Sequence, residues 1–223
     1  MGASLVLAGS IVALAAVALL LAGLVWERFR LHRRLCHLYW AAGLFLVFVT
    51  LAQEAALYVG AWSGLLIQSY LILVAVLVGV LSMGSAELAL PRRWRSLWFG
   101  FVGVTSALVV AAAILYPAGR SIVMDGVVTG VPPLPVVVTS SLLTFPSAVL
   151  LVLTSLVGAL RQKRYSLLFI AAGTVVISGS GGLYLAALPV ALYYAEFVGI
   201  ALLFMGFVRV PGLSAPTARP YSS

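Results

Sequence analysis

Residues 4–26 read SLVLAGSIVALAAVALLLAGLVW and are followed directly by residues 27–34, ERFRLHRR. The first stretch has no charged side chain and is long enough to cross the hydrocarbon core of a bilayer, which takes about 20 residues of α-helix. The second stretch carries four arginines, and basic residues mark the cytoplasmic end of a membrane helix. The junction therefore predicts a membrane helix with its N-terminus outside. Because the apolar run is longer than a signal-peptide core and has its arginines on the far side, we expect it to stay in the mature protein.

The whole chain has the composition of a membrane protein. Of its 223 residues, 64% are hydrophobic and only 8% are charged, which leaves too few polar groups to coat a water-soluble protein of this size. The 13 basic residues outnumber the 5 acidic ones, but they stand in short clusters between apolar runs, which is typical of membrane topology and not of a nucleic-acid-binding face. We therefore expect membrane lipids as the surroundings, no nucleic acid as a partner and a multi-pass location in the cell membrane.

Six further stretches have the length and hydropathy of the first. A segment in lipid must satisfy its own backbone hydrogen bonds, so each stretch predicts a helix. The seven predicted helices span residues 4–26, 38–59, 65–86, 97–116, 136–160, 167–187 and 190–208. The predicted fold is an all-α, seven-transmembrane-helix bundle over residues 1–210, followed by a short cytoplasmic tail at residues 211–223. Through seven crossings, every Lys and Arg except Arg120 falls on one side, which predicts the N-terminus outside and the C-terminus in the cytoplasm.

The connection over residues 117–135 is the only long loop of the predicted topology. It is rich in Gly and Pro, carries Arg120 and Asp125, and has a moderately apolar middle at residues 122–124. It either lies on the membrane surface as a lid or serves as a flexible link, and the second role is the commoner one for such loops.

The sequence also contains a weak internal repeat. RRLCHLYWAAG at residues 33–43 aligns with KRYSLLFIAAG at residues 163–173. In both segments a basic loop is followed by a helix start rich in small residues. The alignment predicts that the first three helices repeat as the last three, with the fourth helix as a linker.

Two carboxyl groups fall at bilayer depth, where an ionisable side chain is costly and usually faces the interior of a bundle. Glu196 lies nearer the middle of the bilayer, whereas Glu54 lies about one turn inside the outer end of its helix, close enough to the headgroups to be hydrated. Glu87 comes just before Arg92 and Arg93 and is expected to form an ion pair at the cytoplasmic interface. Amides, phenols and hydroxyls extend this polar layer. The predicted ligand-binding residues are Glu196, Glu54, Gln68, Gln53, Tyr193, Tyr70, Thr144 and Ser178.

Stripes of Ser, Thr and Gly at helical spacing run along the same helices and include Thr50, Ser82 and Thr174. Small and hydroxyl side chains are ordinary packing residues between membrane helices, and we favour that role for the stripes. For Glu54 and Glu196, a binding role and a packing role stay equally open, because burying a carboxylate costs more free energy than packing alone regains.

Several kinds of chemistry are not expected from this sequence. Cys36 is the only cysteine, which rules out an intramolecular disulfide, a four-thiolate metal site and a Cys-x-x-Cys-His haem attachment. His32 and His37 both lie at the cytoplasmic edge and cannot hold a haem near the middle of the bilayer. The sequence has no Ser/His/Asp set, no glycine-rich phosphate loop and no His/carboxylate metal cluster. We expect a protein without enzymatic activity, metal or cofactor.

Seven helices with an outside N-terminus resemble the topology of microbial rhodopsins. Those proteins hold retinal through a lysine in the middle of the seventh helix, whereas Lys163, the only lysine here, falls in a predicted cytoplasmic loop. The resemblance therefore implies the topology without the pigment. WAAG at residues 40–43, LSMGSAEL at 81–88 followed by PRR at 91–93, and EFVGIALLF at 196–204 resemble a group of uncharacterised prokaryotic seven-helix membrane proteins. That resemblance covers most of the chain and implies the fold but no known activity.

The leading functional hypothesis is a bundle that binds a small molecule or ion in an outward-opening polar cavity, as a transporter or receptor-like sensor, with Glu196 as the central polar group. The alternative is a structural or accessory subunit of a larger membrane complex. A cavity lined by Glu54, Gln68 and Glu196 would favour the first, and a filled core with both glutamates capped would favour the second. Because the loops are short, signalling would need a separate membrane or cytoplasmic protein partner.

Overall fold

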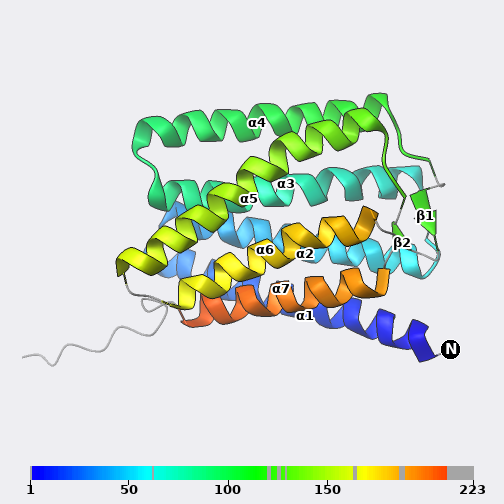
Figure 1. Cartoon of the computed structure of the whole chain (residues 1–223), viewed down its shortest axis with the longest axis horizontal. Coiled ribbons are helices and arrows are strands. Elements are labelled where there is room, and N and C mark those ends of the chain that lie inside the picture. Colours follow the sequence, from blue (N-terminus) through cyan, green and yellow to red (C-terminus); the bar gives the residue numbers. More distant parts are fainter. Residues whose placement is uncertain are drawn as a thin grey trace, which may run out of the picture.

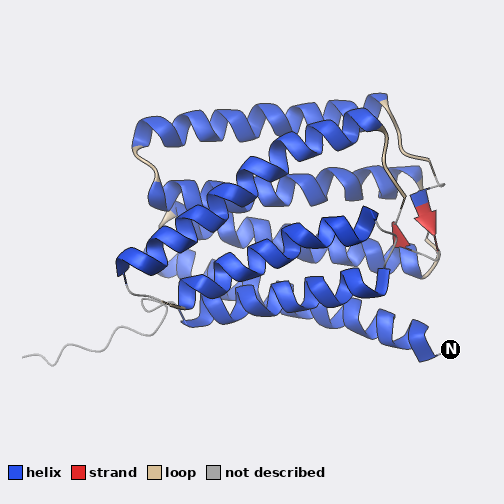
Figure 2. Cartoon of the chain, in the orientation of Figure 1, coloured by secondary structure: helices blue, strands red, loops and turns tan. Residues whose placement is uncertain are grey.

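The computed structural model describes residues 2–61, 63–119, 122–124, 127–128, 130–162, 165–185 and 189–209, with the side chains of most of them. These residues form a bundle of seven long helices that run alongside one another (Figure 1). The helices are α1 (Gly2–His32), α2 (Leu35–Tyr58), α3 (Gly64–Ala89), α4 (Arg92–Leu115), α5 (Leu134–Gln162), α6 (Ser166–Leu185) and α7 (Pro189–Arg209). Two short strands, β1 (Val123–Met124) and β2 (Val127–Val128), pair antiparallel at one end of the bundle (Figure 2).

The helices follow the apolar stretches of the sequence. The largest differences from the predicted ends occur at the basic segments, where α1 continues to His32 and α4 already begins at Arg92, because arginine has a good helix propensity. Among the described residues, α1 to α5 each hold a stretch long and apolar enough to cross a membrane, with mean hydropathy between 1.9 and 2.4, while the described apolar stretch of α6, Leu167–Ile177, is shorter. The chain is therefore a helical membrane protein.

Six of the helices form a ring, and the remaining one lies outside it. The helices α1, α2, α3, α5, α6 and α7 contact one another in that order, α7 contacts α1, and α4 packs on α3 and α5 at the edge (Figure 1).

Two glycines lie where consecutive helices come close together. Gly43 lets α2 approach α3, since a Cβ there would lie 2.5 Å from Leu81 Cδ2. Gly173, its equivalent in the predicted repeat, lets α6 approach α7, where a Cβ would lie 2.9 Å from Leu203 Cγ. Both glycines therefore lie at close contacts between consecutive helices, while the repeat itself stays a prediction.

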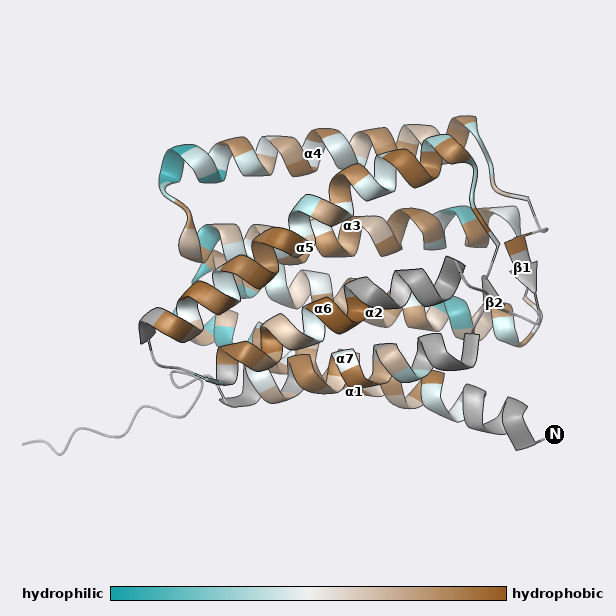
Figure 3. Cartoon of the chain, in the orientation of Figure 1, coloured by the Kyte–Doolittle hydropathy of each residue, from teal (hydrophilic) through white to brown (hydrophobic). Residues whose placement is uncertain are grey.

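One end of the bundle gathers basic side chains. At this end α1 and α3 terminate and α2 and α4 begin, so the arginines of residues 28–34 and those of the start of α4 lie at the same end of the bundle; we call it the basic end (Figure 3). Glu87 forms the predicted ion pair here, but its partner is Arg95, with 2.6 Å between Oε1 and Nη1, and not Arg92 or Arg93. Arg95 lies one turn into α4, where it reaches the end of α3, whereas the two arginines before it are exposed.

The interior of the ring is filled by aliphatic side chains. Leu14 and Ala18 on α1 pack with Leu51 on α2 and Ile200 on α7. The outward surfaces of the helices are apolar as well, and side chains such as Phe145, 72% exposed in the isolated chain, face lipid in a bilayer (Figure 3). Buried polar side chains stand out against this background and are the place to look for a site.

Candidate functional site

Glu54 and Tyr70 meet near the end of the bundle opposite the basic end. Glu54 is four residues before the end of α2, and Tyr70 is six residues after the start of α3. Because the two helices are consecutive and antiparallel, these positions lie at a similar depth. The Tyr70 hydroxyl donates a hydrogen bond to Glu54 Oε1. Glu54 is only 7% exposed, so this carboxyl is buried.

A second polar pair links the same two helices. Gln53 Nε2 donates to Ser69 Oγ at 2.9 Å, and the Ser69 hydroxyl donates to the backbone oxygen of Leu66 at 3.0 Å. Since the Ser69 proton is already used for Leu66, Ser69 can only accept from Gln53, which fixes the orientation of the Gln53 amide. We call Gln53, Glu54, Ser69 and Tyr70 the polar cluster.

Two oxygen atoms of the polar cluster, Glu54 Oε2 and Gln53 Oε1, are buried without a hydrogen-bond partner among the described residues. Buried polar atoms are paired in the great majority of cases, because an unpaired one costs about 1–3 kcal/mol. Both atoms are acceptors when the carboxyl is ionised. The polar cluster therefore has the capacity to accept hydrogen bonds or a positive charge from a further group.

The loop between α4 and α5 covers this end of the two helices. Ala118 and Ile122, each 6% exposed, pack with Leu57 and Tyr70, and β2 contacts α2. The described part of the loop is thus packed on the helix ends, which favours the lid over the flexible link. The same packing shows that the expected hydration of Glu54 is wrong. The Glu54 carboxyl lies only one turn from the end of α2, but apolar side chains of the loop cover this end.

Gly130 anchors this loop and provides a test of the lid. Its N–H donates to the Ile122 carbonyl oxygen at 2.8 Å, and a Cβ at this position would lie 2.5 Å from Ile122 Cα. Gly130→Ala should therefore push Ile122 off the helix ends. Hydrogen exchange in the loop and in the last turn of α2 should become faster than in the parent protein. Gly103→Ala, at a glycine whose Cβ position has nothing within 4 Å, is the control; equal exchange in both variants would contradict the lid.

Three predicted ligand-binding residues, Glu54, Gln53 and Tyr70, come together in the polar cluster. Gln68 lies at the same level of α3 but is only half-buried and takes part in neither hydrogen-bonded pair. Thr144 is half-buried on α5, roughly 15 Å along the helix from its start, and so lies deeper in the bundle.

The other three predicted ligand-binding residues are Glu196, Tyr193 and Ser178. Their backbones belong to α7 and α6, but their side chains lie outside the described residues. The place of Glu196 at the centre of a site therefore stays a prediction.

A second buried polar node joins α3, α4 and α5 deeper in the bundle. The Ser82 hydroxyl donates to the Gly79 carbonyl oxygen at 2.6 Å, accepts from Trp98 Nε1 at 3.1 Å and lies 3.3 Å from Ser147 Oγ. Both serines are fully buried. Because these polar atoms satisfy one another, the node is a structural junction that holds α4 against the ring.

Other hydroxyls of the predicted stripes bond to their own helices. Thr50 donates to the Val47 carbonyl oxygen at 2.8 Å, and Thr174 donates to that of Ile170 at 2.9 Å. These hydroxyls need no ligand, which agrees with the packing role expected for them.

Ser69 and Trp98 make buried polar contacts that were not predicted from the sequence. A signal existed for Ser69, because Ser69 precedes Tyr70 as Gln53 precedes Glu54, and the two polar pairs stand at similar depths of consecutive helices. Trp98 offered no comparable signal, since the direction of its indole about the axis of α4 depends on the tertiary packing.

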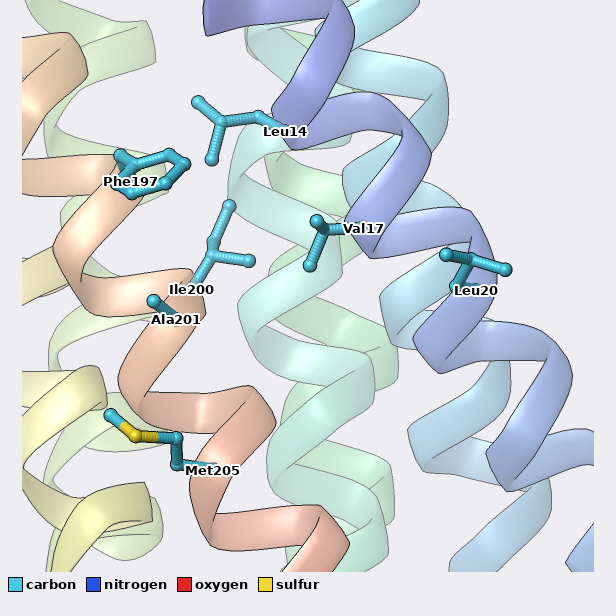
Figure 4. Close-up of a pocket in the computed structure, with 7 residues that line it drawn as sticks. All are labelled: Leu14, Val17, Leu20, Phe197, Ile200, Ala201 and Met205. Atoms are coloured by element: carbon cyan, nitrogen blue, oxygen red, sulfur yellow. The ribbon is translucent and has the colours of Figure 1, made fainter.

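Two surface hollows lie away from the polar cluster. One, of about 220 Å³, runs between α1 and α7, where Leu14 and Val17 face Phe197 and Ile200 (Figure 4). The other is an open depression at the start of α4, with Arg92 in its lining. Neither hollow includes a member of the polar cluster, in which Glu54 and Tyr70 are buried and Gln53 and Ser69 are half-buried.

No protein-family model, no curated protein and no solved structure matches the chain. The resemblances to microbial rhodopsins and to prokaryotic seven-helix membrane proteins stay predictions. In the part of the chain that the structure describes, no group of three or more His, Cys, Asp or Glu side chains gathers within reach of one metal ion. The fold and the site define a helical membrane protein with a buried carboxyl beneath a packed loop.

Proposed function

We propose that this chain is a multi-pass protein of the cell membrane that crosses the bilayer seven times and binds a small molecule or ion in the outer half of its bundle, as a transporter or a receptor-like sensor. The observation that carries the proposal is Glu54. Its carboxyl is 7% exposed at membrane depth, bonded to Tyr70 through one oxygen and without a described partner at the other. Ionisable groups at this depth are costly and usually serve ligand, ion or proton chemistry.

The topology in this proposal draws on helix length and charge. α6 and α7 hold 20 and 21 residues, and about 20 residues at 1.5 Å each match the hydrocarbon thickness of roughly 30 Å. In the sequence, every Lys and Arg except Arg120 falls at the helix ends and connections of the basic end, or at the end of α7 and in the stretch that follows it. By the positive-inside rule the basic end is cytoplasmic. The start of α1 and the polar cluster then lie on the outer side, and residues 211–223, outside the described residues, are cytoplasmic.

Cysteine labelling tests this orientation. Cys36 is 4% exposed and therefore a poor probe, so Cys36→Ala provides the background. In intact cells, Ala61→Cys in the exposed α2–α3 connection should react with a membrane-impermeant thiol reagent, whereas Tyr165→Cys, at a position 73% exposed between α5 and α6, should react only after permeabilisation. The reverse pattern would invert the topology.

A binding role explains the polar cluster better than a packing role does. At the node around Ser82, a buried polar group that only joins helices has its hydrogen bonds made within the protein. Glu54 is buried to a similar degree, yet Oε2 lacks such a partner among the described residues. A ligand that pairs with this oxygen offsets the cost of burying it.

Ligand-dependent thermal stability in detergent tests the binding function. The parent protein is screened with sugars, amino acids, amines and inorganic ions, and a solute that binds the folded state should raise the melting temperature. Glu54→Gln keeps an acceptor for Tyr70 and should fold normally but lose this stabilisation. Glu196→Gln is expected to lose it as well, whereas Glu87→Gln, at the basic end, should behave like the parent. A binding role for Glu54 would be wrong if each stabilising solute acted equally on the parent and on Glu54→Gln.

The alternative function, a structural or accessory subunit of a larger membrane complex, is favoured by a different observation. The hollow between α1 and α7 is lined by apolar side chains, and such a groove accepts a neighbouring helix or lipid. On this alternative, Glu54→Gln and Glu196→Gln should both be silent in the solute screen, and the chain should migrate with a larger assembly after mild extraction from its native membrane.

A further inference from the structure

We infer that the ligand of the polar cluster is a monovalent cation, bound by Glu54 Oε2 and Gln53 Oε1. The inference rests on the proposed function and deepens it, since it gives the chemical class of the ligand at the same site. Three observations carry it: the kind of atom that is left unpaired, the charge of the surroundings and the closure of the site.

The two unpaired atoms are Gln53 Oε1, which is an acceptor, and Glu54 Oε2, which is an acceptor when the carboxyl is ionised. Tyr70 donates to Glu54 Oε1, and the Gln53 amide nitrogen is bonded to Ser69, whose own proton goes to Leu66. The carboxylate or phosphate oxygens of an anionic ligand would find no hydrogen-bond donor at these two oxygens and would be repelled by them. Carboxylate and amide oxygens are instead the ligands that hard cations prefer, and they also accept the N–H groups of an ammonium.

No described Lys or Arg lies near enough to neutralise Glu54. Along α2 the nearest arginine is Arg34, at the N-cap of the helix and about 30 Å away at 1.5 Å per residue. The described arginines of α1 and α4 gather at the same distant end. A buried carboxylate is costly unless it takes up a proton or meets a positive charge, and in this proposal a bound cation supplies that charge.

The closure of the site limits the charge and kind of the cation. Glu54 is 7% exposed and the loop packs over the helix ends, so an ion must shed most of its water to bind. Magnesium gives up its water reluctantly, and calcium takes about six to eight oxygen ligands, more than this cluster offers. One carboxylate balances one positive charge, and a divalent ion would leave a net charge in an apolar interior. The cluster therefore fits an alkali ion or a protonated amine headgroup.

A cation titration tests the inference. The parent protein in detergent is unfolded thermally at constant ionic strength while N-methyl-D-glucamine chloride is replaced stepwise by sodium, potassium or methylammonium chloride. The melting temperature should rise saturably with at least one of the three, and the arm that responds distinguishes an alkali ion from an ammonium group. Glu54→Gln should lose the response. Gln53→Leu should weaken the apparent affinity by roughly tenfold or more, as expected when one hydrogen bond to a charged group is removed.

The controls separate this inference from the proposed function. Glu87→Gln removes a carboxylate at the basic end and should respond like the parent protein. If a neutral or anionic solute stabilises in a Glu54-dependent way and no cation does, the ligand is not a cation and the binding function stands. If no solute of any charge stabilises in a Glu54-dependent way, both are wrong. A cation response that persists in Glu54→Gln would overturn the inference, because the ion would bind elsewhere.

Arg120 gives the last arm of the test, since it is the basic residue of the covering loop and lies outside the described residues. If its guanidinium paired with Glu54, Arg120→Ala would create a cation response that the parent protein lacks. The inference predicts instead that the parent and Arg120→Ala respond alike. A response gained only in Arg120→Ala would overturn it.

Discussion

Gly173→Ala is expected to destabilise the bundle by about 1–3 kcal/mol, the usual cost of overpacking a close contact. A Cβ at this position would lie 2.7 Å from the carbonyl oxygen of Gly199 and 3.0 Å from the backbone nitrogen of Leu203. Both are main-chain atoms of α7, which cannot turn aside as the end of a side chain can, so α6 and α7 must separate. The midpoint of thermal unfolding in detergent measures the loss.

Two glycines of α4 are matched controls for this prediction. No atom lies within 4 Å of the Cβ position at Gly100 or Gly103. Gly100→Ala and Gly103→Ala should leave the midpoint unchanged or raise it slightly, because alanine has the better helix propensity. If Gly173→Ala were as harmless as these two changes, the close α6–α7 contact at Gly173 would be wrong.

Glu54→Leu should also destabilise the bundle, by on the order of 1–2 kcal/mol. Leucine occupies similar space but removes the oxygen that accepts the hydrogen bond of the Tyr70 hydroxyl. Glu54→Gln keeps an acceptor at this place and should cost less. The unfolding midpoints of the two variants, measured without added solute, give the comparison.

A double-mutant cycle with Tyr70→Phe isolates the hydrogen bond between the two side chains. Once leucine stands at position 54, removal of the Tyr70 hydroxyl should cost little, so the losses from the two single changes should not add. Strictly additive losses would mean that the Tyr70–Glu54 hydrogen bond contributes nothing to stability.

The helices could be predicted because apolar length is a property of the sequence alone, and depth along a helix follows from the same count. Counting residues from the helix ends was enough to predict that Gln53, Glu54 and Tyr70 lie at one level of the bundle. Rotation about the helix axis could not be predicted, because in a membrane helix the lipid side and the core side are both apolar. For that reason Gln68, at the correct depth, falls outside the polar cluster.

The loop over residues 117–135 was predicted to be either a lid or a flexible link, and the sequence favoured the flexible link. The apolar character of residues 122–124 is a property of the sequence, but the antiparallel pairing of β1 with β2 was not predicted. The burial of Ala118 and Ile122 depends on contacts with α2 and α3, which lie far away in the sequence. No local pattern encodes such contacts, so Glu54 looked closer to water than it is.

Infrared difference spectroscopy tests the role of Glu54 most directly. Spectra of the purified protein with and without the cation that raises its melting temperature should differ in a carboxyl stretching band, because the ion changes the bonding of Glu54 Oε2. We expect this band in the parent protein and in Glu87→Gln, and we expect it to be absent from Glu54→Gln. A difference spectrum that is the same in the parent protein and in Glu54→Gln would contradict a ligand site at the polar cluster.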